Sequence, residues 1–308
     1  MKNKIKNKYK IIEFIFIVFL LSSCQELVTN DFPDFKSAPT VNSILVAGEP
    51  LAVHLSLADK LDSLPISFIE NASVKLYIDS NFIEDLEYNS NGLYIANSIV
   101  EPGKEYKCLI FAPGYDSITV KQTIPSPLKI ENIEHINIAG TDQEGISFPA
   151  IIIKFQNNPG KTSFFEISVK FIISYRDYKE ERIAYYPIFT DPLILNEGLP
   201  VPVFNNETVE DSSYTLFLNY STLMSSSFNG GPQRTKLFPI IVELRTLSPD
   251  YYHYKKQFYL YNEGKYANGI TESMTASPLY SNVENGFGIF CGYSSFMSDT
   301  IIPEPYEN

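Results

Sequence analysis

Cys24 is the residue whose chemistry is most clearly defined by its neighbours. Five lysines within the first ten residues precede an apolar run from Phe14 to Leu21, and two serines separate that run from the cysteine. A basic start, a short apolar segment and small residues at its end are the pattern of a cleavable export signal. A cysteine directly after the cut offers its thiol to a diacylglyceryl group, and the freed amine accepts a further acyl chain such as palmitate. We therefore expect a lipoprotein signal peptide at residues 1–23 and lipidation of Cys24.

The lipid on Cys24 is expected to hold the protein to a membrane without a peptide span. Each buried methylene contributes about 0.8 kcal/mol, so several acyl chains give a firm anchor. The alternative is an uncleaved membrane anchor, but the apolar run is about half of the ~20 residues needed to cross a bilayer, and Glu13 shortens it. Gln25 follows the cysteine in place of an aspartate, which in familiar Gram-negative sorting permits export. The expected location is the outer membrane, on its periplasmic or its surface face.

Familiar catalytic motifs are absent from the sequence. It contains no H-E-x-x-H, no G-x-S-x-G, no Walker loop and no G-x-G-x-x-G after a strand. The three histidines, His54, His135 and His253, lie far apart in polar contexts, which favours structural or solvated imidazoles. We expect no catalytic residues and no enzymatic activity. The alternative is an envelope hydrolase with an unrecognised site, because function resides in sites that vary on a given fold.

Acidic and amide side chains cluster around one predicted turn. The members of this cluster are Asp79, Asn81, Glu84, Asp85 and Glu87. The cluster lacks the glycine and the terminal glutamate of an EF-hand calcium loop. A solvated turn is therefore the expectation, with a surface calcium site as the alternative. We expect no metal site and no cofactor.

Two cysteines, Cys108 and Cys291, remain besides the lipidated one. Two thiols exclude a disulfide framework. Cys108 alternates with Tyr106 and Ile110, so it is expected to face a core. Buried free cysteine is common, which favours two free thiols. A single disulfide in an oxidising compartment stays open.

The chain is acidic and rich in tyrosine and phenylalanine. Its 308 residues carry 24 basic and 36 acidic side chains, a net charge of −12. Cleavage after residue 23 removes five lysines and one glutamate and leaves 19 basic against 35 acidic side chains, a net charge of −16. Such a charge repels phosphate backbones, so nucleic acid is not an expected partner. With 21 tyrosines, 22 phenylalanines and no tryptophan, the composition favours strands.

The predicted fold class is mainly β, with two antiparallel, Ig-like β-sandwich domains and one amphipathic helix near the C-terminus. Period-two alternation over Leu51–Leu57 and Val74–Ile78 indicates half-buried strands. Asn91-Gly92 predicts a tight hairpin, because both turn positions need positive φ. Further strands are expected near 130–138, 150–155, 164–175, 182–186, 214–218 and 237–247.

Proline-rich segments suggest the domain boundaries. Residues 24–39 are polar and contain two prolines, which predicts a tether between lipid and body. The first sandwich is expected at 40–125, because Pro125-Ser126-Pro127 punctuates the chain. The second is expected at 128–300, followed by a tail at 301–308.

One helix is predicted at residues 249–263. Ser248 can cap it, Asp250 complements its positive end, and Gly264 is a natural stop. Aromatic residues recur at spacings of three and four and form one face: Tyr251, Tyr254, Phe258 and Tyr261. We expect this face to pack on a sheet; an exposed aromatic groove is the alternative.

Two long irregular stretches interrupt the second half. Residues 191–213 hold an acidic patch formed by Glu207, Glu210 and Asp211, and residues 225–236 contain Gly230-Gly231-Pro232. Loops this long inside a compact domain are functional or mobile, so they are candidates for partner contact. Insertions without function are the alternative reading.

Two sets of segments carry resemblances to known proteins. The order of Asn71–Tyr77, Asn91–Tyr94 and Pro102–Tyr106 resembles the carboxypeptidase-regulatory-like and transthyretin-like β-sandwiches. The segment Ser277–Ser295, together with the helix start at Ser248–Tyr252, resembles an uncharacterised family of Bacteroidota outer-membrane lipoproteins. Members of that family tend to be encoded beside TonB-dependent receptors. The second resemblance implies an accessory role at the outer membrane and a TonB-dependent receptor as partner, and it supplies no catalytic residues.

The second segment also has a physical interpretation of its own. Asn285-Gly286 permits a tight turn before a closing strand, and Gly286, Gly288 and Gly292 allow close backbone approach.

The expected function is that of a lipid-anchored, non-enzymatic accessory or binding protein of the cell envelope, associated with a TonB-dependent transporter. The alternative is a nutrient- or glycan-binding surface lipoprotein. Tyrosine and phenylalanine stack on sugar faces, whereas the absence of tryptophan weakens that alternative. An envelope hydrolase is the third reading.

Overall fold

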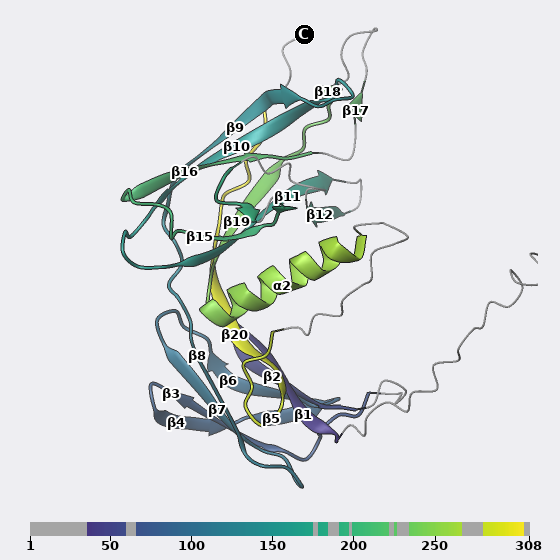
Figure 1. Ribbon diagram of the computed structural model, residues 1–308, viewed down its shortest axis with the longest axis vertical. Coiled ribbons are helices and arrows are strands. Elements are labelled where there is room, and N and C mark those ends of the chain that lie inside the picture. The colour runs from purple at the N-terminus through teal and green to yellow at the C-terminus, as the bar shows by residue number, and fades with distance from the viewer. Residues whose placement is uncertain are drawn as a thin grey trace, which may run out of the picture. The chain divides into compact units, whose positions relative to one another are not determined.

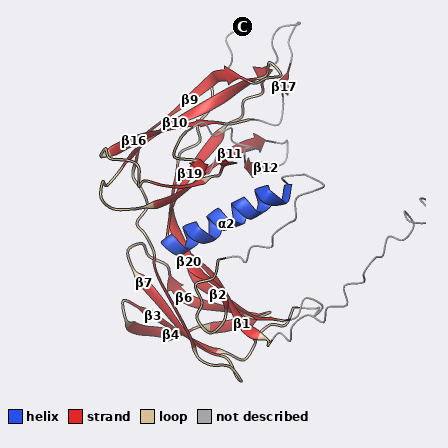
Figure 2. Cartoon of the chain, viewed as in Figure 1, coloured by secondary structure: helices blue, strands red, loops and turns tan. Residues whose placement is uncertain are grey.

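A computed structural model of the chain describes residues 36–59, 66–174, 178–183, 191–196, 199–221, 225–226, 234–266 and 280–304. It is mainly β with one helix in the described part, which confirms the predicted fold class (Figure 2). The first eight strands are β1 (Ala38–Val46), β2 (Pro50–Ala58), β3 (Ser73–Ile78), β4 (Asn81–Asp85), β5 (Glu87–Ser90), β6 (Leu93–Ile99), β7 (Glu105–Phe111) and β8 (Ile118–Thr123).

The remaining elements follow a short connection. They are β9 (Ile130–Thr141), β10 (Ser147–Gln156), β11 (Phe164–Ser174), β12 (Lys179–Ile183), β13 (Leu195–Asn196), β14 (Leu199–Pro200), β15 (Val203–Asn205), β16 (Ser213–Asn219), β17 (Ser225–Ser226), β18 (Arg234–Thr235), β19 (Ile240–Leu247), α2 (Pro249–Tyr266) and β20 (Phe287–Met297).

One nine-stranded sheet runs through both halves of the described chain. Its order is β12-β11-β19-β20-β1-β2-β6-β5, and β15 also pairs with β11 (Figure 1). Its pairs are antiparallel except for β1 with β20, which is parallel. The predicted boundary at 125–128 lies in the connection between β8 and β9, and the sheet continues across it through β20.

A four-stranded sheet, β4-β3-β7-β8, packs on the N-terminal strands of the large sheet. Alternate side chains of both sheets form a shared core that includes Val53, Leu76 and Phe290. The predicted strands in this region are confirmed. The hairpin between β5 and β6 is confirmed too, because Asn91 and Gly92 adopt φ of 49° and 75°.

A three-stranded sheet, β16-β10-β9, packs on the other end of the large sheet. The core between them includes Ile153, Leu216, Phe171 and Val242. Within the described residues, the second set of predicted strands is confirmed to within a few residues; residues 175 and 184–186 of those predictions lie outside the described part. The predicted tail also contributes, since Ile301 and Ile240 exchange two backbone hydrogen bonds of 2.8 and 2.9 Å.

β20 lies close beside β1, and glycines make this possible. A Cβ atom on Gly286, Gly288 or Gly292 would lie 2.5, 2.1 or 2.5 Å from a carbonyl oxygen of the neighbouring strand. Gly288 also has a φ of +107°, which disfavours other residues. The predicted close approach is confirmed, and the pairing closes the first sandwich with a strand from the far end of the chain.

Helix α2 covers part of the large sheet through a third core. Tyr251 and Tyr252 pack there with Cys291 and Leu247. The predicted N-terminal cap is confirmed, since Ser248 Oγ accepts a hydrogen bond from the backbone N–H of Tyr251 at 3.4 Å. The predicted end at Gly264 is wrong, because the helix continues to Tyr266.

The predicted aromatic face of α2 is only partly correct. Tyr251 is buried, but Phe258 and Tyr261 are 38% and 40% exposed. The face that meets the sheet also includes Lys255 and Tyr259, because both contact the buried carboxylate of Glu166 on β11.

Candidate binding site

The predicted lipidation site, Cys24, lies outside the described residues, as do the signal peptide and most of the tether. β1 begins at Ala38, two residues inside the predicted tether. Within the described ranges, no helix is long and apolar enough to cross a membrane.

The two remaining cysteines are free and buried, as predicted. Burial raises the pKa of the Cys108 thiol to about 12. Burial also raises the pKa of Cys291, with the Asp250 charge acting in the same direction. Both thiols therefore stay protonated near neutral pH, and a protonated thiol is a poor nucleophile.

The three histidines occupy separate packing environments. His54 packs edge-on against Phe68, with ring centroids 5.4 Å apart. Half-buried His135 lies 2.8 Å from the Tyr220 hydroxyl through Nε2, and burial lowers its pKa. His253 contacts the rings of Phe164, Tyr252 and Tyr280. Across the described ranges, no group of three or more His, Cys, Asp or Glu side chains is placed to hold a metal ion.

The acidic cluster of the sequence is divided among several cation and backbone partners. Asp85 forms an ion pair with Lys75 at 3.4 Å. Asp79 begins the turn between β3 and β4, where it and Ser80 adopt positive φ. Its carboxylate accepts from Lys104 Nζ at 2.8 Å and from the Glu105 backbone N–H at 3.1 Å. The hydrogen bond from Lys104 lowers the pKa of Asp79.

Glu84 joins two strands that belong to different sheets. Its carboxylate on β4 accepts the backbone N–H groups of Asn97 and Ser98 on β6, at 3.1 and 2.9 Å, and also both of their side chains. Burial acts to raise the pKa of Glu84, but these four hydrogen bonds outweigh it and lower the pKa. The carboxylate thus fixes the distance between β4 and β6.

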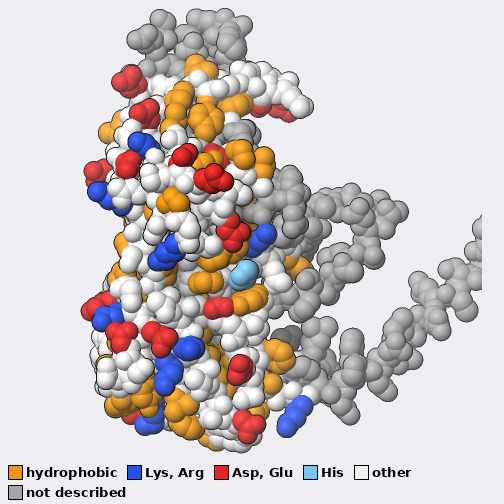
Figure 3. All heavy atoms as spheres, turned by 60° about the vertical axis from the view of Figure 1, so that its left-hand side comes forward, with side chains coloured by type: hydrophobic (Ala, Val, Ile, Leu, Met, Phe, Trp, Pro, Cys, Tyr) orange, Lys and Arg blue, Asp and Glu red, His pale blue; other side chains and the backbone are white. Residues whose placement is uncertain are grey.

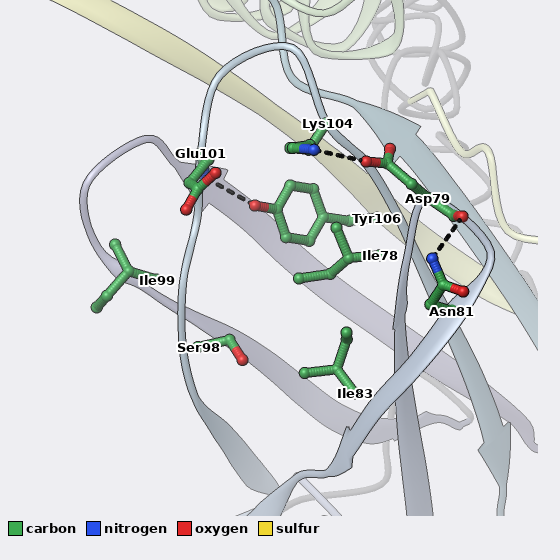
Figure 4. A pocket seen from close by; sticks show the side chains of 9 residues that line it. All are labelled: Ile78, Asp79, Asn81, Ile83, Ser98, Ile99, Glu101, Lys104 and Tyr106. Carbon is green, nitrogen blue, oxygen red and sulfur yellow. Dashed lines mark hydrogen bonds and ion pairs between the residues drawn. The ribbon is translucent and has the colours of Figure 1, made fainter.

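A hollow of about 460 Å³ lies beside this Glu84 link (Figure 4). The β3–β4 turn and the β6–β7 connection form its walls. Its apolar lining consists of Ile78, Ile83, Ile99 and Tyr106, and its polar lining of Asp79, Asn81, Ser98, Glu101 and Lys104. Figure 4 shows the isoleucines around the Tyr106 ring, with Asp79, Lys104 and Glu101 along the rim.

Two isoleucines of the hollow are unusually exposed for their type. Ile83 is 43% and Ile99 is 47% exposed. A register shift between β3 and β4 leaves Ile83 without an opposite residue, which is a β-bulge. Bulges redirect side chains at sheet edges, and this one lies at the edge strand of the four-stranded sheet.

A second concentration of charge lies beneath helix α2. We call it the α2 cluster; its members are Glu166, Lys170, Glu243, Arg245, Lys255 and Tyr259. Glu166, with a side chain only 4% exposed, lies 2.9 Å from Arg245 Nη1, from Lys255 Nζ and from the Tyr259 hydroxyl. Arg245 and Lys170 reach Glu243 at 2.7 and 2.9 Å.

The electrostatics of the α2 cluster favour the charged forms of Glu243 and Arg245. Burial acts to raise the pKa of Glu243, but hydrogen bonds and charges from Arg245 and Lys170 outweigh it and lower the pKa. Burial likewise acts to lower the pKa of Arg245, and its two carboxylate neighbours raise it. Each charge has an opposite partner, so the cluster fixes the helix on the sheet.

The two predicted long loops are more ordered than expected in their described parts. In the first, β13 pairs with β14, and β15 pairs with β11. Buried Asp191 accepts from the Tyr214 hydroxyl at 2.9 Å and from the Phe217 N–H at 3.0 Å, which ties the loop to β16. In the second, β17 pairs with β18, and residues 227–233 lie outside the described part. The acidic patch of Glu207, Glu210 and Asp211 is exposed.

Sequence reasoning identified the acidic residues near the hollow but not the hollow itself. The residues that line the hollow come from the turn after β3 and from the Pro-Gly turn after β6. These two turns are apart in the sequence and lie side by side only in the folded chain. The α2 cluster was missed because Glu166 and Arg245 meet across a strand pair, far apart in sequence.

The chain was compared with known protein families and with curated proteins. The sequence model of a family described as a domain of unknown function (DUF4249) matches residues 25–299. No curated protein matches the chain.

Proposed function

The chain belongs to the family described as a domain of unknown function (DUF4249), and from this premise we propose that it is a lipid-anchored, non-enzymatic binding protein of the bacterial cell envelope. Its proposed place is the outer membrane, with a TonB-dependent transporter as partner, in an organism of the Bacteroidota. The observation that carries the proposal is the basic and apolar leader that ends at Cys24. Acyl chains on that thiol then hold a β-rich, acidic body at the membrane surface.

A binding role suits the described body better than catalysis. Its buried thiols stay protonated, and its buried carboxylates are engaged by cations and N–H groups. On the face drawn in Figure 3, acidic and basic side chains are interspersed with apolar ones. The open hollow between β4 and β6 adds an apolar recess with a charged rim.

The lipid anchor is tested first. Mass spectrometry of the native protein is expected to find an acylated Cys24 at the N-terminus. The Cys24→Ser variant is expected to lose the lipid and leave the membrane fraction, whereas the matched Gln25→Ser variant keeps both. An unmodified thiol with the leader still attached contradicts the anchoring.

The partner is tested by affinity purification from detergent-solubilised envelopes. The expected result is stoichiometric recovery of one outer-membrane β-barrel transporter with the wild-type protein. The Cys24→Ser variant, which does not reach the membrane, serves as the negative control. Recovery of no β-barrel protein contradicts the accessory role.

A glycan-binding function is the second candidate, and exposed aromatic residues on α2 favour it. Phe258 and Tyr261 are exposed, and the Phe258 ring stacks at 18° on the Tyr254 ring. Exposed aromatic planes bind sugar faces, so calorimetry with a glycan panel tests this candidate. Binding that disappears in Phe258→Ala supports it, and silence across the panel rejects it.

A further inference from the structure

The hollow between β4 and β6 is held open before any ligand arrives. The Glu84 carboxylate links the two strands through four hydrogen bonds. The Asp79 turn is fixed to the start of β7, and the Tyr106 hydroxyl accepts the Glu101 backbone N–H at 2.6 Å. Preformed sites bind with a smaller loss of conformational entropy than sites that must be ordered.

The floor of the hollow offers contact to an apolar group. Ile83 and Ile99 leave almost half of their surface exposed on its two sides, while Tyr106 is buried at its base. Its volume of about 460 Å³ falls in the usual range for ligand recesses. Covering these isoleucines removes apolar surface from water, which favours an occupant with a bulky apolar side chain.

The rim of the hollow favours a positive charge next to that apolar group. Among the lining residues, Asp79 and Glu101 are acidic and Lys104 is basic, and Lys104 is already engaged by Asp79. This leaves one acidic charge in excess at the rim, in a chain whose net charge is −12. Complementary charge directs encounter and excludes partners of the same sign.

The edge of the four-stranded sheet lies beside the hollow. β4 pairs with β3 on one side, and Glu84 is its link to β6 on the other. An extended chain follows a strand edge and places every second side chain on the same face.

From this geometry we propose that the hollow binds an extended, basic peptide segment of a protein partner, with one bulky apolar side chain seated between Ile83 and Ile99. Lysine or arginine next to that side chain meets the carboxylates of Glu101 and Asp79. The inference rests on the proposed binding function and specifies the recognition chemistry of one site.

Isoleucine-methyl NMR of the full, lipidated protein in detergent micelles tests the site directly. The probe is the capped peptide Lys-Thr-Phe-Thr-Lys, with Glu-Thr-Phe-Thr-Glu and Lys-Thr-Ala-Thr-Lys as controls. The first peptide is expected to shift the methyl signals of Ile83 and Ile99 and to leave Ile138 on β9 unchanged. Equal shifts with the acidic or the alanine peptide, or none with the first, overturn the proposal.

Variants separate the apolar and the charged contributions. Ile99→Ser is expected to weaken binding of the first peptide about fivefold, and Glu101→Gln about threefold. Ile138→Ser is the matched control, because Ile138 is 50% exposed on a different sheet. A loss in the control as large as in Ile99→Ser contradicts the assignment.

Failure of the proposed peptide site can be distinguished from failure of the proposed accessory function. If the transporter is recovered equally with wild-type protein and with Ile99→Ser, the hollow is not the contact, and the accessory role stands. If the basic peptide binds at Ile83 and Ile99 but no β-barrel protein is recovered, the recognition chemistry stands and the transporter assignment fails.

Discussion

The α2 cluster and the hollow between β4 and β6 both bring acidic and basic side chains together, but with opposite consequences. Beneath α2, the Glu166 carboxylate is 4% exposed and shares three partners from β19 and the helix. At the hollow, the Asp79–Lys104 pair has side chains that are 46% and 45% exposed. The first group of charges is enclosed by the fold, and the second faces solvent.

Burial therefore decides what each set of charges does. Removing one partner from a buried ion pair leaves an uncompensated charge, which is strongly destabilising. An exposed pair contributes little to stability, because water and salt screen it. The α2 cluster accordingly stabilises the fold, whereas the exposed side chains of Asp79 and Lys104 at the hollow can form new ion pairs with a ligand.

The largest expected effect comes from Glu166→Gln. It removes a buried negative charge, leaves Lys255 without its carboxylate and leaves Arg245 with Glu243 alone, so the free energy of unfolding falls by about 3–5 kcal/mol. Urea denaturation monitored by far-UV circular dichroism measures the loss. Glu101→Gln, on the rim of the hollow, is the matched control and stays within about 0.5 kcal/mol of wild type. Similar losses in both variants would break the comparison.

A smaller loss of stability is expected from Ser248→Ala, at the contact between α2 and β20. Ser248 Oγ is buried and accepts from the N–H groups of Tyr251 and Gly292, at 3.4 and 3.1 Å. Ser248→Ala leaves both donors without this acceptor and lowers the free energy of unfolding by about 1–3 kcal/mol. The same denaturation assay measures it, with exposed Ser117→Ala as control. An unchanged midpoint would show that the helix start is held by other contacts.

Glu84 gives an effect at the hollow that depends on pH. Glu84→Gln weakens the hydrogen bonds to β6 and lowers the free energy of unfolding at pH 7 by about 1–2 kcal/mol. The folded pKa of Glu84 lies below the ordinary value of 4.5. Its contribution is therefore complete above pH 4.5 and is lost as the pH falls through the folded pKa.

The corresponding measurement is denaturation between pH 7 and pH 3. The difference between wild type and Glu84→Gln is expected to shrink as the pH drops below 4.5. Exposed Glu87→Gln on β5 is the control, and its free energy of unfolding at pH 7 is expected to stay within about 0.5 kcal/mol of wild type. A difference that stays constant down to pH 3 contradicts the lowered pKa.

The smallest expected effect comes from Lys104→Met. The melting temperature stays close to that of wild type, because the ion pair with Asp79 is exposed. Loss of the Lys104 hydrogen bond lets the pKa of Asp79 rise toward its ordinary value of 3.8. Carboxyl NMR titration and thermal melting measure the two quantities. A melting temperature reduced as far as in Glu166→Gln would remove the distinction between the two regions.

Local features of the fold were predictable from the sequence. The hairpin at Asn91-Gly92, the cap at Ser248 and the close approach at Gly288 each depend on a few neighbouring residues with special backbone or hydrogen-bonding properties. The burial of Cys108 followed from period-two alternation along one strand. Each of these patterns lies within a short segment, so it can be recognised without knowledge of the tertiary structure.

Features that need a long-range register were not predictable. Glu166 lies opposite Arg245 because β11 pairs with β19. Lys255 and Tyr259 of α2 contact the Glu166 carboxylate, so the helix face on the sheet differs from the predicted aromatic face. The hollow likewise requires two separate turns to meet. Asp191, predicted in an irregular loop, is instead a buried acceptor for residues of β16.

The pairing of β1 with β20 has a consequence for the order of folding. β1 is among the first parts of the described chain to be synthesised, yet residues 40–46 find their partners at 287–293. Until residues 287–293 are in place, one side of β1 offers unpaired amide and carbonyl groups to which another strand can pair. Contacts of such long sequence separation slow folding and prolong exposure to aggregation. The edge of β1 therefore depends on β20 for protection, and a truncation before residue 287 leaves that edge of β1 unpaired.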